Sequence, residues 1–480
     1  MSKQLQVQSS VGILVLAAGQ GKRMKSESPK VLIEVAGRPF IHHILRSIHE
    51  AFPGAPVGVV VGYGKEQVQD AVRGDELFSK MKIDFIHQPQ QMGTGDAARC
   101  AMESPWGKSL IEKKSTVLVL PGDLPLIPPA LISQMCDALP RTTALRLLTC
   151  DFPDPTGYGR VIRRGKEGGI LRIVEEKDAN LREKAVHEVA ASIYLFQSSF
   201  LQASLNWISN KNAQGEYYLT DIVERAVKSK KKVEIFKWTS HEDLCGVNNP
   251  LELAQAQKFF NQKIINHWAE QGVRFVDCCS AWVDVSVKIE EGATIYPNVY
   301  LRGKTRVKKG ATLEPGVILT DTEVGEGALI KAGTIADKSV IGSKANVGPY
   351  AHLRPESNVG ARTKIGNFVE LKKARIGSDT SIAHLSYVGD AEVGDRVNIG
   401  CGFVTCNFDG RVIDGQRKHR TVIEDDVFLG SDCQTVAPVK IGKGAYIASG
   451  STITEDVEPE ALAIARSRQV NKPGYAKKVK

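Results

Sequence analysis

The C-terminal half of the chain repeats an aliphatic residue every six positions. Small residues, often glycine, follow many of these anchors directly or three positions later. Six residues for each side and three sides for each coil predict a triangular parallel β-helix, in which the anchors point inward and the small residues fit the corners. The anchors, in several phases, are Ile289, Ile295, Leu301, Val307, Leu313, Leu319, Val324, Ile330, Ile341, Val347, Leu353, Val359, Ile365, Leu371, Ile376, Ile382, Val388, Val393, Ile399, Ile423, Leu429, Ile441, Ile447 and Ile453.

The first half of the chain has a different hydrophobic pattern, in which short apolar runs alternate with amphipathic segments. This alternation predicts an α/β domain with a mostly parallel sheet covered on both faces, and ligands in such folds bind at the carboxyl ends of the strands. The predicted strands are Val11–Leu16, Val57–Val61, Ile83–Ile86 and Val117–Leu120, and the predicted helices include Ile41–His49 and Glu66–Val72. Residues 251–270 lack glycine and proline and predict a connecting helix. We therefore expect domains at 1–250 and 271–480, joined by a helix at 251–270.

Composition limits the classes of function. No apolar run approaches the roughly 20 residues of a membrane-spanning helix, and the N-terminal sequence MSKQLQVQSS lacks the hydrophobic region of a signal peptide, so we expect a cytoplasmic protein without membrane partners. The nine cysteines include no CxxC pair, which argues against a disulfide framework or a zinc ribbon. The net charge of +9 favours anionic partners, and without an arginine-rich block we expect small phosphates rather than nucleic acid.

Two features of the first half indicate phosphate chemistry. The small residues that follow the first predicted strand let backbone N–H groups approach phosphate oxygens, with Arg23 and Lys30 nearby. Asp123 follows another predicted strand, and Asn248 is a second oxygen donor of the kind that hard cations bind. Each feature alone has a simpler interpretation, because a glycine-rich turn is often only a tight connection and a lone aspartate is often a turn residue.

The longer motifs resemble a known family. The string LAAGQGKRM at 16–24 with PKVL at 29–32, and QMGTGDA at 91–97, resemble the nucleotidyltransferases that join a nucleoside triphosphate to a sugar phosphate. Together with the β-helix, they resemble the bifunctional N-acetylglucosamine-1-phosphate uridylyltransferases / glucosamine-1-phosphate N-acetyltransferases of bacterial cell-wall precursor synthesis. The resemblance covers nearly the whole chain and implies a Rossmann-like N-terminal domain, a left-handed β-helix and a homotrimer.

The resemblance also implies the residues of a uridylyltransferase site. Arg23 and Lys30 would neutralise developing charge, while Asp123 and Asn248 would bind Mg²⁺. Two departures fall in the sugar pocket, where Ala190 takes the place of an asparagine and Pro121 that of a tyrosine. The residues implied to bind UTP or the UDP-sugar are Leu16, Ala17, Ala18, Gly19, Arg23, Lys30, Gln91, Gly93, Thr94, Gly159, Glu175 and Asn248.

A second site is implied on the β-helix, where an isolated histidine would more often be a solvated surface group. His384 lies two residues after the anchor Ile382, and its HLSYVGD string matches the family's catalytic base. The residues implied to bind glucosamine 1-phosphate are Arg354, Lys372, Tyr387 and Asn398, and those implied to bind acetyl-coenzyme A are Asn407, Phe408, Lys418, Ser431, Ser449 and Arg466. Phe408 replaces a common tyrosine, the 411–420 loop is longer than usual for the family, and the basic tail 472–480 either reaches coenzyme phosphates or is a solvated end.

Two other functions stay open at this point. One is a single-activity nucleotidyltransferase whose β-helix only assembles the oligomer, and the other is a non-enzymatic subunit like those of the eukaryotic translation-initiation exchange factor. The presence of His384, Lys372 and Arg354 argues against the first. The glycine-rich loop and Asp123 argue against the second.

Overall fold

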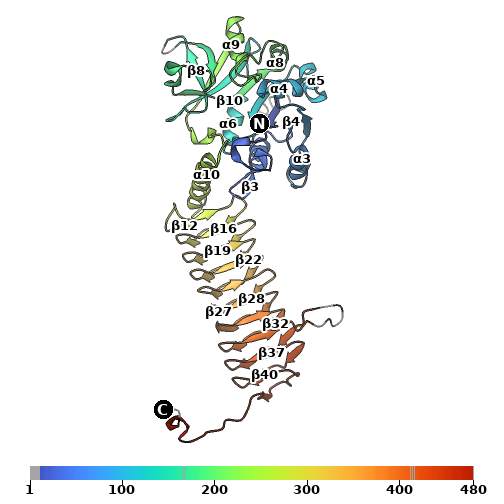
Figure 1. Cartoon of the computed structure of the whole chain (residues 1–480), viewed down its shortest axis with the longest axis vertical. Coiled ribbons are helices and arrows are strands. Elements are labelled where there is room, and N and C mark those ends of the chain that lie inside the picture. Colours follow the sequence, from blue (N-terminus) through green and yellow to red (C-terminus); the bar gives the residue numbers. More distant parts are fainter. Residues whose placement is uncertain (1–10, 166–167, 411, 413–414, 416, 479–480) are drawn as a thin grey trace. The chain divides into compact units, whose positions relative to one another are not determined.

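The computed structural model describes residues 11–165, 168–410, 412, 415 and 417–478. The chain forms two compact units, Met1–Phe260 and Asn261–Lys480, which meet within helix α10 (Pro250–Glu270) (Figure 1). The functional boundaries expected at residues 250 and 270 stay a prediction, because a compact unit need not coincide with a functional one. None of the helices in the described ranges is both long enough and apolar enough to cross a membrane. Residues 1–10, on which the expectation about a signal peptide rests, lie outside the described residues.

The N-terminal unit is built on a mixed sheet. Its main path runs β11-β7-β10-β6-β1-β4-β5, with β8 pairing β10 and β9 pairing β8. The strands β6, β1, β4 and β5 are parallel, whereas β10 runs antiparallel to β6, β7 and β8. The strands are β1 (Val11–Ala17), β4 (Val57–Val61), β5 (Ile83–His87), β6 (Thr116–Pro121), β7 (Thr143–Asp151), β8 (Gly159–Arg163), β9 (Ile170–Val174), β10 (Glu188–Gln197) and β11 (Lys232–Trp238), with a separate pair β2 (Glu34–Val35) and β3 (Arg38–Pro39).

Helices cover both faces of this sheet, as the alternating pattern predicts. Aliphatic side chains of α2, α3 and α6 share one buried cluster with alternate sheet residues such as Ile13 and Val59. Side chains of α4, α5, α8 and α9 share a second cluster with Leu14 and Val60, so successive strand residues face opposite layers. The helices are α2 (Phe40–Ala51), α3 (Lys65–Arg73), α4 (Thr94–Glu103), α5 (Pro105–Glu112), α6 (Pro129–Met135), α7 (Leu181–Lys184), α8 (Ser198–Ser204) and α9 (Asp221–Lys228), with 3₁₀ turns η1 (Lys22–Met24), η2 (Lys30–Leu32), η3 (Phe78–Lys80) and η4 (Glu242–Leu244).

The C-terminal unit is a parallel β-helix with three sheets, each strand pairing with the strand of the next coil (Figure 1). The first sheet is β12 (Arg274–Phe275), β15 (Thr294–Ile295), β18 (Thr312–Leu313), β21 (Leu329–Ile330), β24 (Asn346–Val347), β27 (Lys364–Asn367), β30 (Ser381–His384), β33 (Asn398–Ile399), β36 (Phe428–Leu429), β39 (Tyr446–Ile447) and β41 (Leu462–Ala463). The second is β13 (Trp282–Val283), β16 (Tyr300–Arg302), β19 (Ile318–Thr320), β22 (Ile335–Asp337), β25 (His352–Leu353), β28 (Glu370–Lys372), β31 (Tyr387–Gly389), β34 (Val404–Cys406), β37 (Gln434–Val436) and β40 (Thr452–Ile453). The third is β14 (Lys288–Ile289), β17 (Arg306–Val307), β20 (Glu323–Val324), β23 (Val340–Ile341), β26 (Asn358–Val359), β29 (Arg375–Ile376), β32 (Ala391–Val393), β35 (Thr421–Ile423) and β38 (Val439–Ile441), and a 3₁₀ turn, η5 (Tyr475–Lys477), lies near the C-terminus.

The aliphatic anchors form the interior of the β-helix. Every predicted anchor from Ile289 to Ile453 is buried, and none exposes more than 5% of its surface. The pattern overlooked Ala336, Thr405 and Thr435, which are also buried within their strands. Thr405 is tolerated there because its hydroxyl accepts a hydrogen bond from the Gly389 amide at 2.8 Å.

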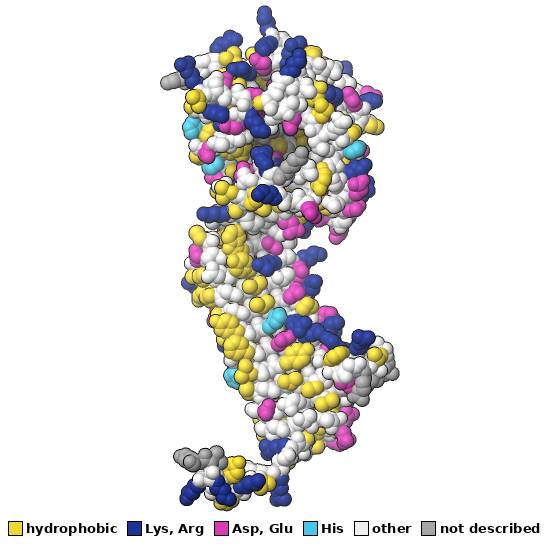
Figure 2. Space-filling view, viewed as in Figure 1, with side chains coloured by type: hydrophobic (Ala, Val, Ile, Leu, Met, Phe, Trp, Pro, Cys, Tyr) yellow, Lys and Arg dark blue, Asp and Glu magenta, His cyan; other side chains and the backbone are white. Residues whose placement is uncertain are grey.

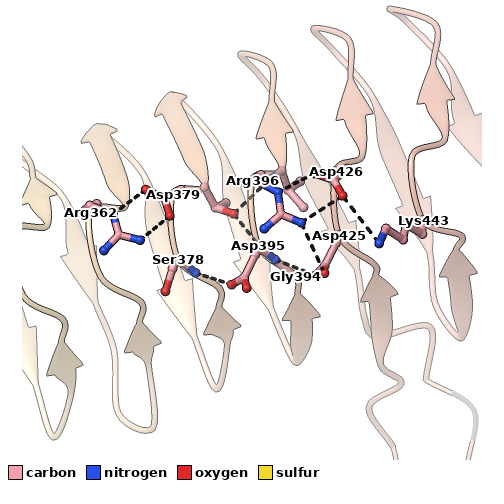
Figure 3. Close-up of polar contacts among 11 residues, drawn as sticks. Arg362, Ser378, Asp379, Gly394, Asp395, Arg396, Asp425, Asp426 and Lys443 are labelled. Atoms are coloured by element: carbon pink, nitrogen blue, oxygen red, sulfur yellow. Dashed lines mark hydrogen bonds and ion pairs between the residues drawn. The ribbon is translucent and has the colours of Figure 1, made fainter.

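Charged pairs connect neighbouring coils at the corner between the third and first sheets (Figure 3). Arg362 binds both carboxylate oxygens of Asp379 at 2.7 and 2.5 Å, and Arg396 binds both of Asp426 at 2.6 and 3.0 Å. All four residues have positive φ angles between 56° and 62°, so the corner holds them in the same left-handed conformation. The Arg362–Asp379 pair joins the coil that carries His384 to the coil before it.

Candidate active sites

The carboxyl ends of the parallel strands surround a cavity of about 380 Å³ in the N-terminal unit. Of the residues predicted from the sequence to bind nucleotide, sugar or metal, those that line it are Leu16, Ala18, Gly19, Lys30, Gln91, Gly93, Thr94, Asp123 and Glu175. Ala17 is instead buried in β1. Gly159 lies against Glu175, another residue predicted to bind UTP or the UDP-sugar, because a Cβ at position 159 would be 3.5 Å from Glu175 Oε2.

Four of the predicted charged and polar residues meet at this cavity, and two of them, Lys30 and Asp123, line it. Lys30 Nζ lies 2.5 Å from Asp123 Oδ2 and 2.7 Å from Asn248 Oδ1, although these partners are 93 and 218 residues away in sequence. Arg23 donates a longer hydrogen bond of 3.4 Å to the same Asn248 oxygen. Gly21 permits this approach, since its φ is +69° and a Cβ there would come within 2.9 Å of Lys30 Cβ.

The oxygen donors at this point suit a hard divalent cation. One carboxylate and one amide oxygen, from Asp123 and Asn248, converge on the same ammonium group, so the protein already holds a positive charge between them. The described residues contain no group of three or more His, Cys, Asp and Glu side chains that could enclose a metal. A metal here would therefore take its remaining ligands from phosphate and water.

The cavity is also lined by acidic and hydroxyl groups, several of which the sequence interpretation missed. Glu175 Oε1 accepts a hydrogen bond from Thr220 Oγ1 at 2.9 Å, and burial raises the pKa of this carboxyl group above its usual value. Ser192 and Tyr194 of β10 also line the cavity. The predicted departure Ala190 is 3% exposed and packs in the apolar cluster beneath α4 and α9, so it supplies only a methyl group.

A basic cluster lies at the corner between the second and third sheets of the β-helix. Arg354 follows β25, Lys372 ends β28, and Lys418 belongs to the loop before β35. The pKa of Lys372 is lowered, first by the neighbouring Lys418 ammonium and then by burial and Arg354. Figure 2 shows Lys and Arg side chains gathered on the β-helix at the level of β28 and β32. Positive charges held this close together repel one another, and a bound phosphate would neutralise them.

The predicted base lies at the corner between the first and second sheets. His384 ends β30 and is exposed, and its Nδ1 lies 2.7 Å from Asn367 Oδ1 on the preceding coil. The two residues are direct partners in the parallel pairing of β27 and β30. Asn367 was not predicted, because a single asparagine at a corner is typical of a turn. Tyr387 of β31 lies between the histidine and the basic cluster.

Three of the residues predicted to bind the coenzyme, Ser431, Ser449 and Arg466, lie along the same corner of the β-helix as His384. Strand pairing places His384, Cys401, Ser431 and Ser449 at equivalent positions of successive coils, two residues after their anchors. Arg466 follows them and donates a 2.8 Å hydrogen bond to the Ser449 carbonyl.

Other predicted residues of this unit lie apart from that corner. Asn398 is exposed on β33, where it pairs with Ser381 of the preceding coil. Asn407 is buried and donates to Asp390 at 2.5 Å, while Phe408 exposes 60% of its surface. Parts of the 411–420 loop (residues 411, 413–414 and 416) and of the tail (479–480) lie outside the described residues.

Comparisons with known proteins match the two units of the chain to different families. Residues 13–164 match the model of the MobA-like NTP transferase domain, 279–347 that of the GMPPB C-terminal domain, and 420–455 that of the bacterial transferase hexapeptide with six repeats. Relatives named bifunctional protein GlmU match almost end to end. That of Sorangium cellulosum is 43% identical over 97% of this chain and 96% of its own length, and that of Shouchella clausii is 41% identical over 97% and 98%.

The chain belongs to the GlmU family. A relative from Geotalea uraniireducens, also named bifunctional protein GlmU, is 40% identical over 98% of this chain and all of its own length. The chain is therefore a bifunctional transferase, with a nucleotidyltransferase domain and a β-helix of hexapeptide repeats. GlmU nucleotidyltransferases use a divalent metal ion, which agrees with the oxygen donors of Asp123 and Asn248.

Proposed function

We propose that this chain makes UDP-N-acetylglucosamine in two steps at two separate sites. The β-helix transfers the acetyl group of acetyl-coenzyme A to the amine of glucosamine 1-phosphate, and the N-terminal unit then joins the product to the uridylyl group of UTP. The convergence of Lys30, Asp123 and Asn248 at the cavity that Lys30 and Asp123 line is the observation that carries the first unit's assignment. Because UTP and acetyl-coenzyme A are cytoplasmic metabolites, we propose the cytoplasm as its location.

In the uridylyl transfer, the phosphate of N-acetylglucosamine 1-phosphate attacks the α-phosphorus of UTP and pyrophosphate leaves. Arg23 and Lys30 hold positive charge where negative charge develops on the phosphate oxygens. Asp123 and Asn248 would hold Mg²⁺, which supplies further charge neutralisation when bound. The backbone around Gly19 presents no side chain that would keep phosphate oxygens away from its N–H groups.

In the acetyl transfer, the amine of glucosamine 1-phosphate attacks the thioester carbonyl carbon and the coenzyme A thiolate leaves. Arg354 and Lys372 bind the sugar's phosphate at one border of the second sheet, and Lys418, which the resemblance implies for the coenzyme, neighbours Lys372. At the other border, Asn367 Oδ1 can only accept a hydrogen bond, so Nδ1 of His384 carries the proton and Nε2 keeps its lone pair. His384 Nε2 then accepts the proton that the amine loses during attack.

Asn367 gives this mechanism a specific prediction. Replacing it with leucine removes the acceptor that fixes the His384 ring, and we expect acetyl transfer to fall about 10- to 100-fold, the effect of one hydrogen bond to a group that becomes charged. Asn367→Asp keeps an acceptor and stabilises the imidazolium, so it should restore most of the rate and move the acid limb of the pH–rate profile to higher pH. A leucine variant with the parent's rate and pH profile would contradict this role.

We propose that the active assembly is a homotrimer of β-helices. Tyr350, Phe368 and Leu385 occupy equivalent corners of successive coils beside His384, each with positive φ and with 57–58% of its surface exposed. The rings of Tyr350 and Phe368 stack with centroids 5.8 Å apart. Large apolar side chains at strained, exposed corners favour a partner surface, and Figure 2 shows hydrophobic side chains in a stripe along the β-helix. Sedimentation should give the mass of three chains, and a monomer would contradict the proposal.

A further inference from the structure

The wall of the N-terminal cavity contains a serine in an unusual conformation. Ser192 has a φ of +57°, in the left-handed region that favours glycine, although it lies in the middle of β10. The strand pairing of β10 with β7 is interrupted at this point, between Ala190 and Tyr194. The interruption turns Ser192 toward the cavity, which it lines together with Pro121. A serine that keeps this strained backbone at a cavity wall indicates that its hydroxyl has a use there.

A buried tyrosine lies behind this serine. Tyr194 is 1% exposed, lines the same cavity, and its hydroxyl has no hydrogen-bond partner within the described residues. Burial raises the pKa of the Tyr194 phenol well above its usual value, the Glu175 and Asp221 carboxylates raise it further, and the Ser192 hydroxyl opposes them. Tyr194 and Ser192 lie two residues apart on β10, and both line the cavity together with Glu175. A buried hydroxyl without a partner is unfavourable unless a ligand or an adjusted neighbour completes its hydrogen bond.

Two of the neighbouring side chains offer a ligand no hydrogen-bonding atom. Ala190 supplies a methyl group and Pro121 a ring without a donor, so neither offers a polar side-chain atom. Glu175 is engaged by Thr220 through one of its oxygens. Ser192 therefore adds a hydroxyl group to the part of the lining that includes Pro121 and Tyr194.

We propose that Ser192, positioned by Tyr194, forms a specificity-determining hydrogen bond to a hydroxyl or acetamido group of the hexosamine phosphate. This inference rests on the proposed uridylyltransferase function and names the residues of this chain that hold the sugar. Tyr194 is a positioning residue, because it acts through Ser192. The ligand class is a hexosamine phosphate rather than the nucleotide, since the resemblance places Pro121 in the sugar pocket and Pro121 lines the cavity together with Ser192.

The test compares Ser192→Ala, Ser192→Gly and Tyr194→Phe with the parent chain. We expect each variant to raise the KM for N-acetylglucosamine 1-phosphate about two- to tenfold, the usual effect of one hydrogen bond, with the KM for UTP unchanged. Ser192→Gly should not lower the melting temperature, because glycine accepts the positive φ. Acetyl transfer from the β-helix serves as an internal control for intact protein.

The outcomes separate this inference from the proposed function. If the parent forms UDP-N-acetylglucosamine and all three variants keep its KM for the sugar phosphate, the Ser192 contact is wrong and the uridylyltransferase function stands. If the KM for UTP rises instead, the serine faces the nucleotide and the assignment to the sugar is overturned. A parent without uridylyl transfer would overturn the proposed function on which the inference rests.

Discussion

Replacing Asp123 with alanine should lower the rate of uridylyl transfer at least about 100-fold and leave the rate of acetyl transfer unchanged. Asp123 supplies the carboxylate at the meeting point of Lys30 and Asn248, so its loss removes the charged oxygen proposed to hold Mg²⁺. Its side chain is 28% exposed, so the change leaves no apolar void in the core. The rates of both reactions should be measured on one preparation of the full-length variant.

Asp84→Ala is a matched control, because this exposed aspartate lies on the edge strand β5 and does not line the cavity lined by Asp123. It should keep both activities. Loss of both activities in Asp123→Ala, with an unchanged melting temperature, would contradict two independent sites. Uridylyl transfer close to the parent's rate would show that the metal is held elsewhere.

Replacing His384 with alanine should lower acetyl transfer by about 10²–10⁴-fold, the usual contribution of a general base. The amine must lose a proton as it attacks the thioester, and His384 Nε2 is the free nitrogen on a ring that Asn367 orients. His384 is exposed and is not one of the inward anchors, so the β-helix should keep its stability. Uridylyl transfer should be unchanged.

His352→Ala is the matched control for this prediction, since His352 is an exposed histidine on β25 of the same β-helix. It should retain the parent's rate of acetyl transfer. If His384→Ala acetylated glucosamine 1-phosphate within a factor of a few of the parent, another group would have to accept the proton.

The β-helix was predictable because its signal is long and physically simple. A buried aliphatic side chain every six residues satisfies one geometry along three sheets of nine to eleven strands, and each predicted anchor is buried. Three further interior residues, Ala336, Thr405 and Thr435, were not predicted. Alanine and threonine lack the large aliphatic side chain by which the other interior positions were recognised. The antiparallel course of β10 was also missed, because pairing direction depends on contacts between strands far apart in the chain.

The candidate sites were predictable only where motifs extended beyond one residue. The meeting of Lys30 with Asp123 and Asn248 follows from the rule that loops after parallel strands share one edge of the sheet. Asn367 and Ser192 carried no such signal. The role of Asn367 depends on the register between coils, and that of Ser192 depends on a backbone angle, neither of which one sequence reveals.

Mixing the two inactive variants tests the central claim of two separate sites most directly. Asp123→Ala and His384→Ala should each fail to convert glucosamine 1-phosphate, acetyl-coenzyme A, UTP and Mg²⁺ into UDP-N-acetylglucosamine when assayed alone by mass spectrometry. Mixed together, they should form it, because the first variant supplies acetylated sugar phosphate that the second can use, whereas a chain carrying both substitutions should form none. A mixture that makes no UDP-N-acetylglucosamine, from two folded variants, would contradict the account.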